Sequence, residues 1–137
     1  MKKGFTLIEL FGSLILLAII ATITIPVIIG AIDSSKEKTN IANVNTLILA
    51  AKDYHGLNLL NPQAYPIDED ESILNFLSFS GTEPDEATHT GYGIYVNSAG
   101  RVAVALQYDD RCYTKSFVSE TITGTTSANI LECVIPS

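Results

Sequence analysis

The sequence predicts an α+β fold in which one long N-terminal α-helix packs on a small, three- to four-stranded antiparallel sheet. Three observations support this prediction. The run from Leu10 to Ile32 has no charged residue, and the segment that follows it up to Gly56 is amphipathic with a helical period. Short β-branched and aromatic segments, separated by turn residues, occupy the C-terminal part. With 137 residues, the chain has room for one small domain and one membrane-length segment.

Residues 5–32 are predicted to form a hydrophobic helix that spans a membrane. The charge-free run would be about 34 Å long as a helix, enough to cross a hydrocarbon core of roughly 30 Å. An ordinary cleaved secretory signal is the alternative, because Lys2 and Lys3 give a basic start. It is less favoured, since a signal core has only about 7–15 apolar residues and no A-x-A site follows here. Lys36 and Lys38 balance the first two lysines, so charge leaves the orientation open.

Residues 33–56 are predicted to continue the same helix as an amphipathic segment. Asp33 or Ser34 would also serve as a new N-cap, but no Pro or Gly interrupts the segment until Gly56, which offers a C-cap. The apolar positions recur at helical spacing and are Ile41, Val44, Ile48 and Ala51. This stripe is expected to cover the apolar face of the sheet.

Pro26 and Gly30 are helix-weakening residues in the second half of the predicted membrane segment. Proline lacks a backbone donor and its ring clashes with the preceding turn, so a bend or a locally opened stretch is expected near Thr22 to Pro26. Membrane helices tolerate such residues without any further role. The other interpretation is that the helix must flex in an assembly.

Residues 57–137 are predicted to form an acidic globular head. Its first part is loop-like, with Pro62, Pro66 and Pro84, and the stretch 72–79 is expected to form a short helix. The side chains that this helix would bury are Ile73, Leu74, Phe76 and Leu77. Strands are expected at 92–97 and 101–108, joined as a hairpin, and two further candidates lie at 112–118 and 129–135.

The charge of the head argues against binding to nucleic acid. From Asp53 onward the sequence has twelve acidic residues and only three basic ones, Arg101, Arg111 and Lys115. Such a surface repels DNA and anionic lipid headgroups at long range. Direct nucleic-acid binding by the head is therefore not expected.

The two cysteines, Cys112 and Cys133, leave two interpretations open. An even count in a small, loop-rich region suits a disulfide and an oxidising exterior. Such a bond would stabilise the fold by about 3 kcal/mol on the chain-entropy account. Alternatively, both are reduced, buried thiols.

Residue patterns that would indicate an enzyme are missing from the sequence. His55 and His89 belong to no metal-ligand spacing and to no nucleophile motif, and the GYG at 91–93 is not a phosphate loop. The acidic clusters at 68–71 and 83–86 would suit Ca²⁺ by ligand type, but they lack EF-hand spacing, so solvated charge is favoured. We therefore expect no catalytic residue, no metal site and no cofactor.

Glu9 lies just before the charge-free run and has two interpretations. With Thr6 it forms the T-x-x-E pattern of a capping box, which satisfies backbone donors at a helix start. The other is a carboxylate at the membrane interface of an uncleaved anchor, where its cost is small.

The segment from Gly4 to Pro26, with its short basic leader and the motif GFTLIEL, resembles the start of type IV pilins and of the related pseudopilins. The resemblance implies cleavage after Gly4 by a prepilin peptidase and methylation of the new N-terminus at Phe5, with residues 1–4 removed as a leader peptide. It also implies that Glu9 pairs with the N-terminal amine of a neighbouring subunit and that Pro26 loosens the helix. In many pilins a disulfide between two cysteines fixes the C-terminal segment, and the resemblance implies the same for Cys112 and Cys133.

The sequence departs from the family pattern at three positions. Gly12 and Ser13 stand where bulky aliphatic residues are usual, and Ala18 stands where glycine is frequent. These differences bear on where the helix would open in a filament.

On this resemblance, the chain is expected to be a structural subunit of a type IV pilus-like filament. It would enter the cytoplasmic membrane as a single-pass precursor and then join copies of itself or related pilins in a helical polymer at the cell surface. The alternative within the family is a pseudopilin of a type II secretion or DNA-uptake apparatus. The alternative outside it is a signal-anchored surface domain that binds a ligand and does not polymerise.

Overall fold

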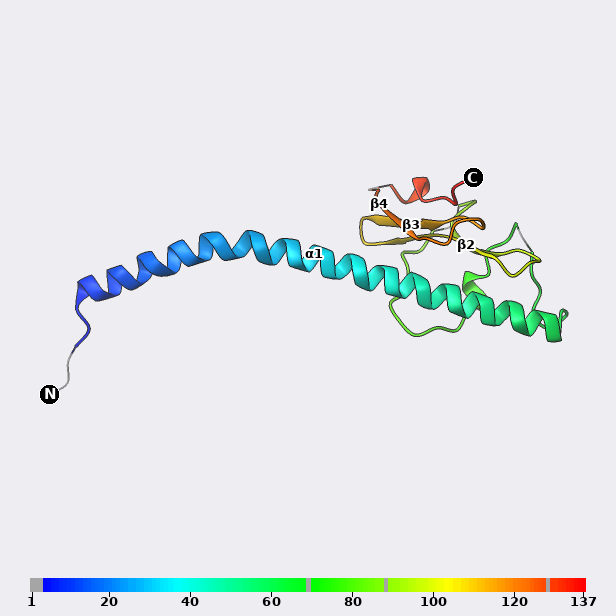
Figure 1. Ribbon diagram of the computed structural model, residues 1–137, viewed down its shortest axis with the longest axis horizontal. Coiled ribbons are helices and arrows are strands. Elements are labelled where there is room, and N and C mark those ends of the chain that lie inside the picture. The colour runs from blue at the N-terminus through cyan, green and yellow to red at the C-terminus, as the bar shows by residue number, and fades with distance from the viewer. Residues whose placement is uncertain (1–3, 69, 88, 128) are drawn as a thin grey trace. The chain divides into compact units, whose positions relative to one another are not determined.

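The computed structural model describes residues 4–68, 70–87, 89–127 and 129–137 (Figure 1). Met1, Lys2 and Lys3 of the predicted leader, and Glu69 of the first acidic cluster, lie outside the described residues. The chain divides into two compact units, Met1–Glu37 and Lys38–Ser137. Each unit is described by itself below.

The helix α1 comprises Leu7–Leu60 and continues through the boundary between the units. It passes Gly56, where a C-cap was expected, because Gly56 keeps a helical backbone and the positive φ angles of glycine occur elsewhere in the described chain. The helix ends instead just before Asn61, whose N–H donates to the Leu57 carbonyl at 2.9 Å. Asn61 precedes Pro62, and a residue before proline is disfavoured in the helical region. Proline therefore sets this end of the helix.

The sheet of the second unit has four antiparallel strands in the order β1-β2-β3-β4. The strands are β1 (Gly93–Val96), β2 (Val102–Tyr108), β3 (Arg111–Lys115) and β4 (Thr123–Thr126). Ile94 pairs with Val104, and Leu106 pairs with Tyr113 across the next ladder. The α+β class and the three strands expected at 92–97, 101–108 and 112–118 are confirmed, with a shorter third strand.

The strand expected at 129–135 is wrong. This segment contains the short 3-10 helix η2 (Ile130–Glu132). The Asn129 side chain accepts the Leu131 N–H at 3.1 Å, which closes a turn in place of a strand. The fourth strand is β4, a Thr- and Gly-rich segment without the apolar alternation of a recognisable strand. Its pairing with β3 at the edge of the sheet gives it an extended conformation.

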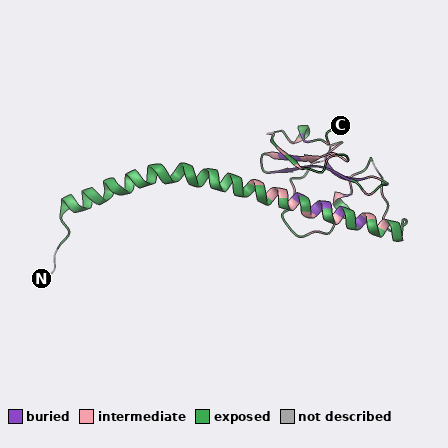
Figure 2. Cartoon of the chain, viewed as in Figure 1, coloured by how far each residue is buried: buried purple, intermediate pink, exposed green. Residues whose placement is uncertain are grey.

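The core of the second unit forms between α1 and the sheet. The predicted stripe on α1 is largely confirmed, since Val44, Ile48 and Ala51 are buried while Ile41 is partly buried. Leu47 and Tyr54 complete the buried face of the helix, which appears purple in Figure 2. On the sheet, the largest fully buried side chains are Ile94, Val96, Val102, Val104, Leu106 and Tyr113.

The segment expected to be a helix at 72–79 contains only the 3-10 turn η1 (Leu74–Phe76). Its chain is held to the outer edge of β1, where the Ile73 N–H donates to the Ile94 carbonyl at 2.8 Å and Ser72 Oγ accepts the Ile94 N–H at 3.0 Å. Ile73 is buried as expected, whereas Phe76 is 62% exposed. Pairing with the strand edge thus replaces the longer helix and leaves the Phe76 ring at the surface.

Candidate functional site

The N-terminus of α1 is closed by a capping box between Thr6 and Glu9. The Glu9 carboxylate accepts the Thr6 N–H at 3.0 Å and the Thr6 hydroxyl at 2.8 Å. In return, the Glu9 N–H reaches Thr6 Oγ1 at 3.4 Å and the Thr6 carbonyl at 3.1 Å. Within a single chain, Glu9 therefore has the capping role that its spacing predicts, and it accepts hydrogen bonds without any partner chain.

The Gly4–Phe5 bond, the predicted cleavage site, lies outside the helix. Both residues are exposed, and nothing lies within 4 Å of the position that a Cβ on Gly4 would take. Phe5 itself is 82% exposed. The bond is thus accessible in an irregular stretch directly before the capping box.

The apolar part of α1 is exposed among the residues that the structure describes. None of its most hydrophobic membrane-length window is buried, and the segment appears green along its length in Figure 2. By length and composition, α1 can cross a membrane. An apolar surface of this extent is stable only against lipid or against other protein surfaces.

The polar side chains inside this segment are satisfied by the helix itself. The hydroxyl of Ser13 donates to the Leu10 carbonyl at 2.8 Å, and that of Thr22 donates to the Ile19 carbonyl at 2.7 Å. The Thr24 hydroxyl donates to the Ile20 carbonyl at 3.0 Å. These bonds remove the need for water, so the three residues are compatible with an apolar surrounding.

Pro26 lies inside α1, which remains helical on both sides of it. The locally opened stretch expected near Thr22 to Pro26 is absent from the described helix, since one proline removes only one ladder hydrogen bond and the flanking turns remain intact. Gly30 also has helical neighbours, and nothing lies within 4 Å of the position of an added Cβ. Packing within the chain thus does not require glycine at position 30.

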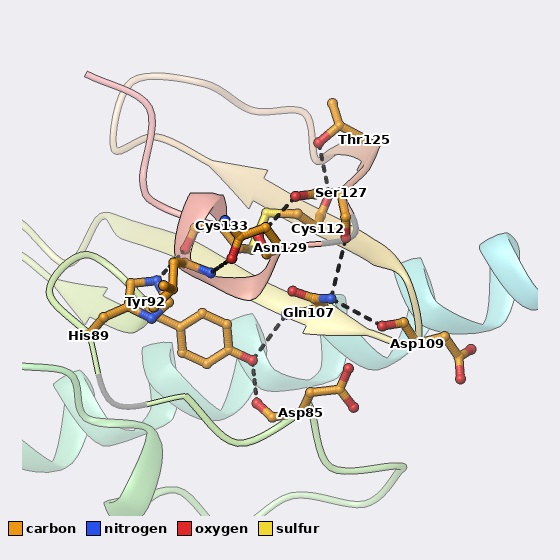
Figure 3. Close-up of a disulfide and its surroundings, with 11 residues drawn as sticks. Asp85, His89, Tyr92, Gln107, Asp109, Cys112, Thr125, Ser127, Asn129 and Cys133 are labelled. Carbon is orange, nitrogen blue, oxygen red and sulfur yellow. Dashed lines mark hydrogen bonds between the residues drawn. A yellow bond between two sulfur atoms is a disulfide. The ribbon is translucent and has the colours of Figure 1, made fainter.

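The C-terminal segment is attached to the sheet by a disulfide between Cys112 and Cys133, one of the two interpretations that the cysteine count leaves open (Figure 3). Cys112 belongs to β3, and Cys133 follows η2 and is fully buried. The Ile135 N–H adds a hydrogen bond to the Gly91 carbonyl at 3.1 Å. The segment is therefore fixed at two points on the same unit.

His89 takes part in this attachment, a role that its loop position did not predict. Its Nε2 lies 3.2 Å from the Cys133 carbonyl oxygen, and its ring packs against Tyr92 at a centroid distance of 5.3 Å (Figure 3). A carbonyl only accepts, so Nε2 carries the proton in this contact. The buried Nδ1 has no hydrogen-bond partner among the described residues.

Tyr92 links the loop at 83–87 to β2. Its hydroxyl accepts the Gln107 N–H at 3.1 Å and donates to the Asp85 carbonyl. The Asp85 N–H returns a hydrogen bond to the Gln107 carbonyl at 2.8 Å. Desolvation and then the nearby charge of Asp109 raise the pKa of the Asp85 carboxyl. Its charged form is thus disfavoured in the folded head.

The second predicted acidic cluster lines a hollow of about 420 Å³ with mixed polar and apolar walls, to which Glu83, Asp85 and Glu86 contribute. Within the described part of the chain, no group of three or more His, Cys, Asp or Glu side chains is arranged to hold a metal ion. His55 lies apart from His89, on α1, where its ring would meet a Cβ placed on Gly100. The structure thus places the two histidines in separate packing environments.

Comparison with known proteins gives no relative for this chain: no family model, no curated protein and no solved structure matches it.

Proposed function

We propose that the chain is a structural subunit of a type IV pilus-like filament, assembled through its N-terminal helix. A prepilin peptidase would cut after Gly4, and Phe5 would become the methylated N-terminus. The subunit would first be a single-pass protein of the cytoplasmic membrane. It would then enter a helical polymer of copies of itself or related pilins at the cell surface. Contacts of this kind are heterologous and propagate without closing into a ring.

The observation that carries the proposal is the uncovered apolar helix joined to a folded, disulfide-linked unit. The membrane-length window of α1 has no buried residue, while residues 38–137 have their own core. Lipid covers such a helix before assembly, and packed helices of other subunits would cover it afterwards. The hydroxyl groups of Ser13, Thr22 and Thr24 are satisfied internally and fit either surrounding.

Glu9 has a specific part in this proposal. Cleavage would leave the mature chain with one new amine at Phe5, close to a carboxylate that the capping box already holds in place. In an apolar filament core, an amine and a carboxylate without water neutralise each other when they come within about 4 Å. A pair between neighbouring subunits would also fix their axial register.

The alternative with a structural argument is a signal-anchored surface domain that does not polymerise. The capping box favours it, because Glu9 needs no second chain for its hydrogen bonds. In that case the uncut leader and helix would remain as a membrane anchor, with the head outside. A pseudopilin would share all the features of the filament proposal and differ only in the machine that it serves.

The intact mass and the N-terminal sequence of the protein from its own cells decide between these classes. A chain that begins with methylated Phe5 supports the filament proposal, and a chain that keeps Met1 overturns it. The variant Gly4→Leu should retain the leader. Gly12→Leu is the matched control, because Gly12 also has no atom within 4 Å of an added Cβ but lies beyond the cleavage site.

A further inference from the structure

A second hollow lies beside α1, entirely within the unit Lys38–Ser137. It measures about 480 Å³ and lies between α1 and a wall made by Tyr65 and residues 76–80. The helix contributes Thr46, Leu49, Asp53 and Leu57 to its lining. Two of its apolar walls are open to solvent, since Leu49 is 61% exposed and Phe76 is 62% exposed.

The composition of this hollow restricts what would cover it. Asp53 is an exposed carboxylate between Leu49 and Leu57, one helical turn from each. An apolar partner alone would bury this charge without compensation, which is costly. The hollow therefore fits a partner that presents aliphatic side chains followed by one cation.

The unit Met1–Glu37 carries such a surface on its part of α1. Ile29, Ile32 and Lys36 follow one another at intervals of three and four residues, so they share one face of the helix. Both isoleucines are exposed, at 55% and 50%. Lys36 is also exposed, and it is the first cation after the charge-free run.

The two faces have matching spacing. Thr46, Leu49 and Asp53 repeat the intervals of Ile29, Ile32 and Lys36, so a single offset of seventeen residues aligns all three pairs (46 − 29, 49 − 32, 53 − 36). In two parallel helices, this offset corresponds to an axial shift of about 26 Å at 1.5 Å per residue. Parallel chains shifted along a common axis are the arrangement of a heterologous polymer.

We infer that the hollow beside Asp53 is a docking site for α1 of a second copy of this chain. Ile32 of the incoming helix packs against Leu49, and its Lys36 ammonium neutralises the Asp53 carboxylate. The inference rests on the proposed filament and assigns one of its contacts between subunits. Lys38 does not replace Lys36, because two residues correspond to a rotation of about 200° around a helix.

Cysteine cross-linking of assembled filaments tests the contact. The full chain carrying both Lys36→Cys and Asp53→Cys should give a ladder of disulfide-linked multimers after mild oxidation, seen on a non-reducing gel. Mass mapping should find the link between positions 36 and 53, with Cys112 still bonded to Cys133. The matched control carries Lys38→Cys with Asp53→Cys and should give at least tenfold less multimer. Equal cross-linking in the two proteins, or none in either, overturns the inference.

Charge reversal gives a second, independent measurement. Asp53→Lys and Lys36→Glu should each lower filament yield about tenfold, and the double variant should restore it. Yields that do not change in the single variants overturn the docking site. Filament formation by the unmodified protein distinguishes failure of the proposed function from failure of the docking contact alone. If it forms no filaments, both the proposed function and the inference fail, whereas filaments without the 36–53 contact remove the inference alone.

Discussion

Cys112 and Cys133 are separated by 21 positions in the sequence, yet their Cα atoms are 5.5 Å apart, and a disulfide joins them. The bond connects β3 to the segment after η2, which has no strand to hold it on the sheet. Both side chains are buried in the core. The C-terminal segment is thus fixed by a covalent link and a few hydrogen bonds.

Removal of this disulfide should destabilise the head markedly. The double variant Cys112→Ala with Cys133→Ala is expected to lose about 3 kcal/mol of unfolding free energy, the value for a loop of this size. Chemical denaturation of the full chain in detergent, followed by the tyrosine signal, would measure it. A reducing agent should lower the stability of the unmodified protein similarly and should not affect the variant. An unchanged midpoint in the double variant would refute the prediction.

Glu9 can be tested for its two roles separately. Glu9→Gln keeps a side chain that completes a capping box but removes the charge, whereas Thr6→Ala removes the cap and keeps the charge. If the charge pairs with a neighbouring amine, Glu9→Gln should reduce filament yield at least tenfold, as should Glu9→Ala. Electron microscopy of sheared filaments, with the amount of subunit in the membrane as reference, measures this. Normal filament yield from Glu9→Gln would limit Glu9 to the capping role.

The helix and most of the sheet were predictable because they follow local patterns. A long run of apolar residues and an apolar stripe with a period of 3.6 residues both indicate an α-helix. The strand β2 is a run of apolar β-forming residues. The fourth strand was not predictable in this way. Thr123 to Thr126 have no apolar alternation. Their extended backbone depends on pairing with β3, a contact between segments that a local sequence pattern does not reveal.

In the candidate site, too, the local contacts were predictable and the long-range contacts were not. The capping box of Thr6 and Glu9 is a local arrangement, so its spacing alone predicted the observed hydrogen bonds. The packing of His89 against Tyr92 and its contact with the Cys133 carbonyl depend on how the tail returns to the sheet. Residue spacing in the sequence does not predict a contact between segments this far apart. A pairing between Glu9 and another chain is likewise beyond what one chain displays.

Gly93 should tolerate no side chain, in contrast to Gly56. Gly93 has a φ of 125° at the start of β1, and a Cβ there would overlap Ser72 Oγ, which accepts the Ile94 N–H. Gly93→Ala should therefore lower the melting temperature of the head by at least 5 °C, corresponding to about 1 kcal/mol or more. Gly56→Ala is the matched control. It lies in α1 with free space around it and should stabilise the helix by up to about 1 kcal/mol. Equal effects at the two positions would contradict this account.

Asp85 should make the stability of the head depend on pH. Because desolvation and Asp109 raise its pKa in the folded state, its contribution to stability is fully present below the unfolded pKa and is lost as the pH rises through the folded pKa. Asp85→Asn should then raise the melting temperature at pH 7 by about 1–2 °C, a small effect because the side chain is mostly exposed. The difference should vanish below about pH 3, where the carboxyl is protonated in both states. Glu86→Gln, in the same hollow, is the control for a general loss of negative charge. A gain for Asp85→Asn that persists unchanged at low pH would show that the amide acts through packing or hydrogen bonding, and would remove the electrostatic explanation.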